Sequence, residues 1–228
     1  MRVKHLLAVL VLVSVGAPLS SCVQMPPQPG QIFYTALGAS DAVGIGAFPL
    51  RNGYVFRVRD DLVNRGRQVE LLNLGIPGAG IGDIKRVSRL VLLAGMRPTL
   101  VTLWTGANDL IGGDDPGNFE QDLEDILNEL RERTSALIVI GDLPDLTRLP
   151  RFIQEPDSDV TVERVSAFNA AIERQASNFN ASIARLSELD MLEELTSDID
   201  GFHPDNEGHR RIAEHFLEVI LPELGLSQ

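Results

Sequence analysis

The sequence predicts an α/β domain with three layers, α/β/α, built around a parallel sheet of about five strands. Two observations lead to this prediction. Short apolar segments rich in β-prone residues alternate along the chain with longer segments whose apolar residues recur at helical spacing. Three of the strand-like segments also end at or beside a glycine. Alternating strands and helices form right-handed βαβ units, which require a parallel sheet covered by helices on both faces.

Five segments have the length and composition of buried strands. They are short and apolar, and most are rich in the branched residues that suit a pleated surface. The fifth has the weakest pattern. In chain order the expected strands cover residues 32–37, 69–74, 99–104, 136–140 and 181–186.

Five amphipathic segments follow these strands or lie between them. The clearest begins at Phe119, because its apolar residues fall at i, i+4, i+7, i+8 and i+11 and charged residues occupy the other face. The last segment follows Asp205 and Asn206, and either side chain could cap a helix there. A proline-containing loop is expected over 142–159. The expected helices cover residues 54–65, 84–94, 119–130, 162–179 and 206–220.

Composition limits the possible functions. The chain has 228 residues, of which 44% are hydrophobic, so it is long enough for one substantial domain, expected over residues 31–228. Its formal net charge is −12 and its pI is about 4.7. This acidity argues against nucleic acid as a partner and against binding to an anionic membrane by charge. We expect a monomer.

The first 22 residues have the pattern of an export signal. A basic segment over 1–5 precedes an apolar segment over 6–15 that is short for a membrane span. The sequence Leu-Ser-Ser-Cys over 19–22 then resembles the lipobox of bacterial lipoproteins. We therefore expect residues 1–21 to be a signal peptide, Cys22 to be lipidated at the cell envelope, and residues 22–30 to form a flexible tether. The alternative is a plain secretory signal, with a secreted or periplasmic product.

Polar residues gather where the first three expected strands end. Ser40 follows the first strand, a glycine turn beginning at Gly75 follows the second, and Asn108 follows the third. The carboxyl ends of parallel strands meet at one edge of a sheet, which is where such folds place ligands. Ser40 is therefore a candidate nucleophile.

A serine nucleophile needs a base, and histidine is the usual base at neutral pH. His203 lies in a loop before the last expected helix, and Asp200, three residues upstream, can reach its ring and orient it. His209 and His215 lie on that helix, where we expect surface or core-edge positions. The Gly75 turn offers backbone N–H groups and Asn108 offers an amide as donors to an oxyanion.

Four motifs in this order resemble the SGNH hydrolase (GDSL lipase/esterase) family, and the resemblance runs from about residue 33 to the end of the chain. They are Gly-Ala-Ser-Asp over 38–41, Asn-Leu-Gly-Ile-Pro-Gly over 73–78, Gly-Ala-Asn-Asp over 106–109 and Asp-Gly-Phe-His-Pro over 200–204. The resemblance implies a flavodoxin-like SGNH hydrolase fold and a serine esterase without metal or cofactor. It implies the catalytic residues Ser40, Asp200 and His203. It also implies an oxyanion hole made by Ser40, Gly75 and Asn108.

One position departs from the family pattern. The family usually has Asp before the serine, whereas this chain has Ala39. That Asp is not a triad member in the family, so the chemistry is expected to survive. Asp41 is expected either to compensate for the missing carboxylate or to cap a helix.

Several alternatives are less well supported. An α/β-hydrolase shares the order Ser, Asp, His, but the sequence lacks Gly-x-Ser-x-Gly, because Ala42 replaces the second glycine. An anchored binding protein on an inactive hydrolase scaffold would be expected to lose part of the triad. Residues 114–118 lack the spacing of a calcium loop. Trp104 is expected in the core, with a substrate platform as the alternative.

The expected substrate is a small-molecule or lipid ester. The resemblance also covers lysophospholipases, thioesterases and carbohydrate O-deacetylases, so it does not select one class. Apolar residues in the loops after Ser40, Asn108 and the fourth expected strand would suit an acyl chain. These loops are too short to form a lid, and we therefore expect short- to medium-chain acyl esters.

Overall fold

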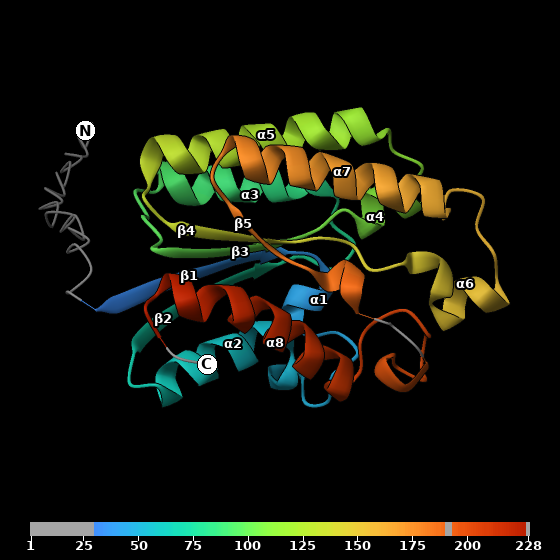
Figure 1. Cartoon of the computed structure of the whole chain (residues 1–228), viewed down its shortest axis with the longest axis horizontal. Coiled ribbons are helices and arrows are strands. Elements are labelled where there is room, and N and C mark those ends of the chain that lie inside the picture. The colour runs from blue at the N-terminus through green and yellow to red at the C-terminus, as the bar shows by residue number, and fades with distance from the viewer. Residues whose placement is uncertain (1–29, 190–192, 227–228) are drawn as a thin grey trace, which may run out of the picture.

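The computed structural model describes residues 30–189 and 193–226 and has the expected three-layer architecture (Figure 1). Five parallel strands form one sheet in the order β2-β1-β3-β4-β5. This order places β1 inside the sheet, with β2 on one side of it and β3, β4 and β5 on the other. The strands are β1 (Gln31–Gly38), β2 (Gln68–Gly75), β3 (Leu100–Trp104), β4 (Leu137–Gly141) and β5 (Ser182–Ala184).

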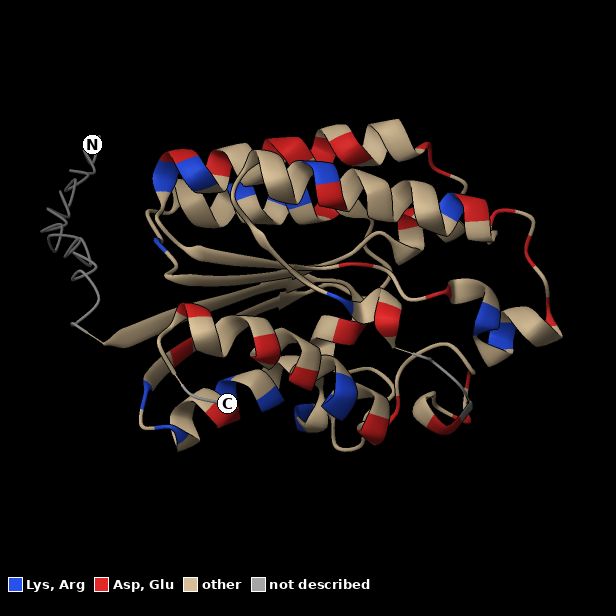
Figure 2. Ribbon diagram, viewed as in Figure 1, with Lys and Arg blue, Asp and Glu red and all other residues tan. Residues whose placement is uncertain are grey.

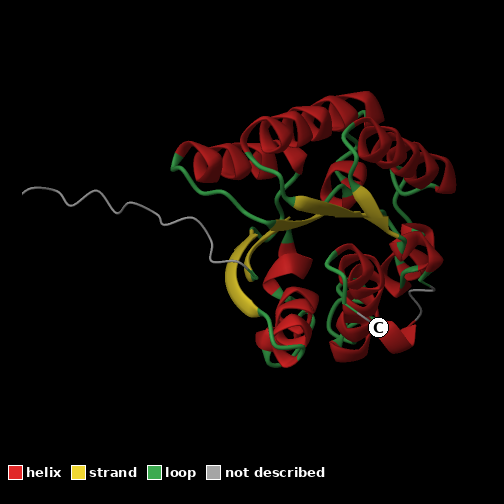
Figure 3. Cartoon of the chain, turned by 60° about the vertical axis from the view of Figure 1, so that its left-hand side comes forward, coloured by secondary structure: helices red, strands yellow, loops and turns green. Residues whose placement is uncertain are grey.

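Helices cover both faces of the sheet (Figures 1 and 3). The upper layer of Figure 1 contains α3 (Ile81–Leu93), α5 (Pro116–Arg133) and α7 (Val162–Asn178). The lower layer contains α2 (Tyr54–Asn64) and α8 (Asn206–Glu223). Each layer packs its apolar face on the sheet, which gives one large hydrophobic core on each side.

Short helices fill the loops between these elements. Most lie at or near the carboxyl edge of the sheet, and none is long enough to show helical periodicity in the sequence. They are α1 (Ser40–Val43), α4 (Ala107–Ile111), α6 (Pro150–Gln154) and the 3₁₀ turns η1 (Leu50–Asn52), η2 (Leu146–Arg148), η3 (Leu186–Glu188) and η4 (Glu193–Leu195). Thus part of the segment expected as a loop over 142–159 is helical.

The fifth strand is shorter than the sequence predicted. It ends at Ala184 because Asp142 accepts hydrogen bonds from the backbone N–H and the hydroxyl of Ser187, both at 2.7 Å. These bonds turn the chain into η3 instead of continuing the strand.

The register of the sheet brings three strand ends together. Gly38 pairs with Gly75 on β2 and with Trp104 on β3. A side chain at Gly38 would lie 2.8 Å from the Trp104 carbonyl oxygen and 3.0 Å from Ala42 Cβ, so only glycine fits. The residues that follow β1, β2 and β3 therefore lie close together at one edge of the sheet.

Two aspartates cap long α-helices. Asp205 accepts a hydrogen bond from the Gly208 N–H at 2.7 Å and begins α8, as one of the two expected alternatives. Asp115, in the segment considered above as a calcium loop, accepts one from the Gly117 N–H at 2.8 Å and begins α5.

The N-terminal expectations lie outside the described residues. This applies to the signal peptide over 1–21, to lipidation of Cys22 and to most of the tether. Among the helices of residues 30–189 and 193–226, none has both the length and the apolar character needed to cross a bilayer.

Candidate active site

The structure brings Ser40, His203 and Asp200 into one hydrogen-bonded chain. Ser40 is the first residue of α1, directly beyond the end of β1, and the other two lie in the loop before α8. His203 Nε2 lies 2.9 Å from Ser40 Oγ, and His203 Nδ1 lies 2.6 Å from Asp200 Oδ2. The carboxylate therefore accepts the Nδ1 proton and leaves Nε2 free to accept the proton of the serine hydroxyl.

Asp200 is held in place by the backbone as well. Its Oδ1 accepts hydrogen bonds from the N–H groups of Phe202 at 2.9 Å and His203 at 3.0 Å. Partial burial alone would raise the pKa of Asp200, but the hydrogen bonds from the His203 ring and from these N–H groups outweigh it. The pKa of Asp200 is therefore below its ordinary value, and this carboxylate is ionised at neutral pH.

The loop that carries His203 is fixed on both sides. The Ser197 N–H donates to the His203 carbonyl oxygen at 2.8 Å, and the Arg151 N–H donates to the Gly201 carbonyl oxygen at 3.0 Å. On the other side Gly46, with φ of +95°, lies so close to Pro204 that a Cβ would be 2.1 Å from its carbonyl oxygen. This close approach sets His203 beside the Ser40 loop.

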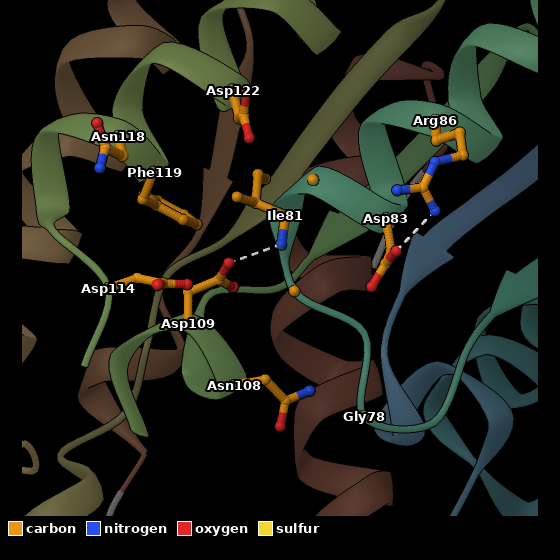
Figure 4. A pocket seen from close by; sticks show the side chains of 12 residues that line it. Gly78, Ile81, Asp83, Arg86, Asn108, Asp109, Asp114, Asn118, Phe119 and Asp122 are labelled. Atoms are coloured by element: carbon orange, nitrogen blue, oxygen red, sulfur yellow. Dashed lines mark hydrogen bonds and ion pairs between the residues drawn. The ribbon is translucent and has the colours of Figure 1, made fainter. Parts of the chain in front are cut away.

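Asn108 lies at the same edge, in the first turn of α4 after β3. Its Nδ2 donates to the Ala79 carbonyl oxygen at 2.9 Å, and the neighbouring Asp109 accepts the Ile81 N–H at 2.7 Å. These two bonds join the loops after β2 and β3, and Figure 4 shows the second of them. An amide carries two N–H groups, so Asn108 retains one for a ligand.

Gly75 does not offer the free donor that the sequence suggested. Its N–H already donates to Asn73 Oδ1 at 3.0 Å, because an asparagine side chain readily turns back onto the backbone two residues later. The next glycine in the loop, Gly78, has φ of +75° and lines the same hollow as Asn108 (Figure 4). Within the described residues, no group accepts a hydrogen bond from the Gly78 N–H. The Pro77–Gly78 dipeptide, typical of a turn with positive φ, was the signal for this position.

Comparison with known families agrees with the motifs. The model of the GDSL-like Lipase/Acylhydrolase family matches residues 36–211, which is most of the chain. The protein belongs to this family. It is a carboxylic ester hydrolase with the SGNH hydrolase fold. A search of curated proteins gives no match.

Solved structures of similar fold include several hydrolases. TesA is 20% identical with a TM-score of 0.69, and the match covers 83% of this chain and 98% of TesA. The psychrotrophic esterase EstA from Pseudoalteromonas sp. is 18% identical with a TM-score of 0.68, covering 86% and 100%. A family 3 carbohydrate esterase from Clostridium thermocellum is 17% identical with a TM-score of 0.66, covering 85% and 97%. Because these sequence identities are low, the similarity shows only that the folds are alike.

The residues around Ser40 show how this GDSL-like hydrolase departs from the family motif. Ala39 is the N-cap of α1 and makes no side-chain cap, and Asp41 lies in the first turn. The expectation that Asp41 caps a helix is therefore wrong, because α1 already begins at Ser40, the residue before Asp41. Burial raises the pKa of Asp41 to about 6, although the nearby His203 lowers it in part. Asp41 thus places a second carboxyl group near the histidine.

Trp104 lies in the core, as one of the two expected alternatives. It is 9% exposed and packs edge-on against Tyr54, with ring centroids 5.6 Å apart, so it belongs to the core. It also lines a small recess beside Ser40.

His209 is buried, not at the surface or the edge of the core. Its Nδ1 accepts the Tyr54 N–H at 3.2 Å, and its Nε2 donates to the Ile45 carbonyl oxygen at 3.0 Å. Both bonds require a neutral ring with its proton on Nε2. Burial lowers the pKa of His209 to about 4, and the bond to Ile45 offsets this only in part. His209 therefore ties the loop after Ser40 to α8 and α2 only when it is uncharged.

His209→Gln is expected to make the free energy of unfolding less dependent on pH between pH 4 and 7. Between the ordinary pKa of 6.5 and about 4, the unfolded chain binds a proton at His209 that the folded chain does not. The free energy of unfolding therefore rises with pH in this window, by about 3 kcal/mol from this group. Chemical denaturation from pH 4 to 7 measures the slope for both proteins.

Asp41, whose raised pKa acts in the opposite direction, is present in both proteins and cancels in their difference. His215→Gln on the same helix is the control and should keep the wild-type slope. Equal slopes in wild type and His209→Gln would contradict the assignment.

Proposed function

We propose that this enzyme hydrolyses esters by acyl transfer to Ser40 and then to water. The observation that carries the proposal is the hydrogen-bonded chain from Ser40 Oγ to His203 Nε2, at 2.9 Å, and from His203 Nδ1 to Asp200 Oδ2, at 2.6 Å. A serine hydroxyl is a weak nucleophile until such a base takes its proton. The geometry supports this transfer without any rearrangement of the three side chains.

The reaction then has two halves. Ser40 Oγ bonds to the ester carbonyl carbon while its proton moves to His203, and the imidazolium gives that proton to the departing alcohol oxygen as the ester C–O bond breaks. Water next attacks the acyl-enzyme, with His203 as base, and the acid leaves as Ser40 recovers its proton. Asp200 keeps the ring in the correct tautomer and stabilises its positive charge.

Three donors are proposed to hold the oxyanion. Ser40 is the first residue of α1, where a backbone N–H has no partner inside the helix. Asn108 contributes its second amide N–H. The Gly78 N–H takes the place expected for Gly75, since Gly78 lines the hollow beside Asn108 and its N–H donates to no other described residue. Each such donor typically contributes about 2.7–4 kcal/mol to the transition state.

The proposed substrates are short- to medium-chain esters of neutral alcohols. The hollow beside Asn108 is lined by four aspartates and a single arginine, Arg86 (Figure 4). Acidic residues are also spread over the loops at the carboxyl edge, at the right of Figure 2. This field disfavours esters with a net negative charge. It therefore argues against phospholipids with anionic headgroups as substrates, whereas a carbohydrate O-deacetylase remains compatible.

Two measurements on the purified enzyme test the proposal. A fluorophosphonate should label Ser40 in the folded protein and not after denaturation, as located by peptide mass spectrometry. Rates on p-nitrophenyl esters of increasing acyl length, with an acetylated sugar alongside, then define the substrate class. No adduct on Ser40 in folded, monodisperse protein would contradict the proposal.

We also propose that the protein is exported and lipidated at Cys22, from the sequence pattern over 1–22. Cells expressing the full chain should incorporate a labelled fatty acid into it, and Cys22→Ser should abolish that label while leaving the protein exported. Equal labelling of the variant would contradict lipidation at this residue.

A further inference from the structure

We propose that the recess beside Ser40 admits an acetyl group and excludes longer acyl chains, with Leu143 as the residue that limits the length. The inference rests on the proposed function and narrows its substrate class to acetyl esters. The recess has a volume of about 10 Å³. This is roughly the space of one water molecule or one methyl group. Its lining includes Ser40, Trp104, Thr105, Asn108, Leu143 and Phe202.

The position of the recess makes it the acyl site. It touches both Ser40 and Asn108, the proposed nucleophile and an oxyanion donor. An acyl group bonded to Ser40 Oγ, with its carbonyl oxygen at Asn108, therefore has its alkyl part beside this recess. The larger hollow lined by Gly78 and Asn108 includes no atom of Ser40 in its wall.

The apolar walls are fixed by their surroundings. Both the N–H and the carbonyl oxygen of Leu143 are hydrogen-bonded to the Asn169 side chain, each at 2.8 Å, and Leu143 is buried. Phe202 packs edge-on between Phe152 and His203, at centroid distances of 6.0 and 4.9 Å. With Trp104 held against Tyr54, the recess has little freedom to widen for a longer chain.

The remaining lining is polar, which also opposes an alkyl chain. Thr105 is 8% exposed, and its Oγ1 is buried without a hydrogen-bond partner among the described residues. Asp41 adds a carboxyl group to the same lining. Because Thr105 Oγ1 is already buried and unpaired, a longer chain would bring carbon beside these polar groups without giving either of them a partner.

The rate series has a clear expected shape. An acyl chain that leaves the recess for water gains nothing from its added methylenes, whereas an enzyme that buries them gains a factor of about four in kcat/KM for each one. A longer chain must in addition displace the fixed walls or leave the recess altogether. We therefore expect kcat/KM for p-nitrophenyl acetate to exceed that for the hexanoate by at least about tenfold.

Leu143→Ala tests the wall directly. Removing three buried carbons opens the recess, so the ratio of kcat/KM for butyrate over acetate should rise about tenfold. Leu146→Ala is the matched control, because Leu146 is buried in the same segment but does not line the recess. Its ratio should stay at the wild-type value. If Leu143→Ala does not fold, the smaller change Leu143→Val with propionate gives the same comparison.

The outcomes separate this inference from the proposed function. A wild-type enzyme that is labelled at Ser40 but prefers hexanoate or octanoate would overturn the acetyl limit alone. An unchanged butyrate-to-acetate ratio in folded Leu143→Ala would overturn the role of Leu143. Absence of both labelling and hydrolysis of any ester would instead refute the proposed function.

Discussion

Replacing Ser40 by alanine is expected to reduce turnover of the best ester by at least about 10⁴-fold while leaving the fold intact. The variant loses only the hydroxyl group, and the oxygen of that group is the atom that bonds to the acyl group in the acyl-enzyme. Ser40 is 5% exposed, and Oγ has His203 as its side-chain partner, so little packing depends on it. The residual rate should reflect only the oxyanion donors and binding, as in other serine hydrolases. Steady-state kinetics, with circular dichroism to verify folding, measure the effect.

The same variant gives a second readout. Ser40→Ala should lose all fluorophosphonate labelling and should still bind the ester with a similar affinity. Near-normal turnover by the variant would mean that another residue is the nucleophile, and the proposed mechanism would have to be abandoned.

Asp200→Asn is expected to lower kcat by about 10²–10⁴-fold without removing the nucleophile. Asparagine retains an oxygen for the Phe202 and His203 N–H groups that Oδ1 now accepts. In place of Oδ2 it presents an NH₂ group to His203 Nδ1, which must then accept a hydrogen bond instead of donating one. The proton of the neutral ring moves to Nε2, and the ring can no longer accept the Ser40 proton.

Asp198→Asn is the matched control for this loop. Asp198 lies two residues earlier and is exposed, and the change removes the same charge without touching the triad. Its kcat should stay within about twofold of wild type. Equal losses in the two variants would show that Asp200 acts only through the net charge of the site.

Much of the site could be predicted because its residues follow strand ends. Ser40 and Asn108 each come directly after an apolar strand, and the parallel register then brings them to one edge. Asp200 and His203 are three residues apart, so local chain geometry alone allows their contact. These relations are short in sequence or follow from a general rule of parallel sheets.

The remaining features depend on contacts that the sequence does not show. Pro77 marks Gly78 as a turn residue, but only the hydrogen bond from Gly75 to Asn73 shows which of the two N–H groups is already used. His209 resembles a surface residue on an amphipathic helix, yet Ile45, 164 positions away, completes its buried partners. Asp41 was misplaced because α1 is too short for its start to be recognised from periodicity.

The direction of β1 has a consequence for where such an enzyme can work. The strand starts at Gln31 and ends at the opposite edge of the sheet, beside Ser40. At the usual rise of a strand the two edges are about 25 Å apart. An attachment at Cys22 would enter the domain from the left of Figure 1, whereas the reactive edge lies at the right. The eight residues after Cys22 reach about 30 Å at full extension. If the protein is tethered as proposed, its reactive edge lies at the far end of the domain from the attachment, which leaves that edge open to soluble or polymer-bound esters.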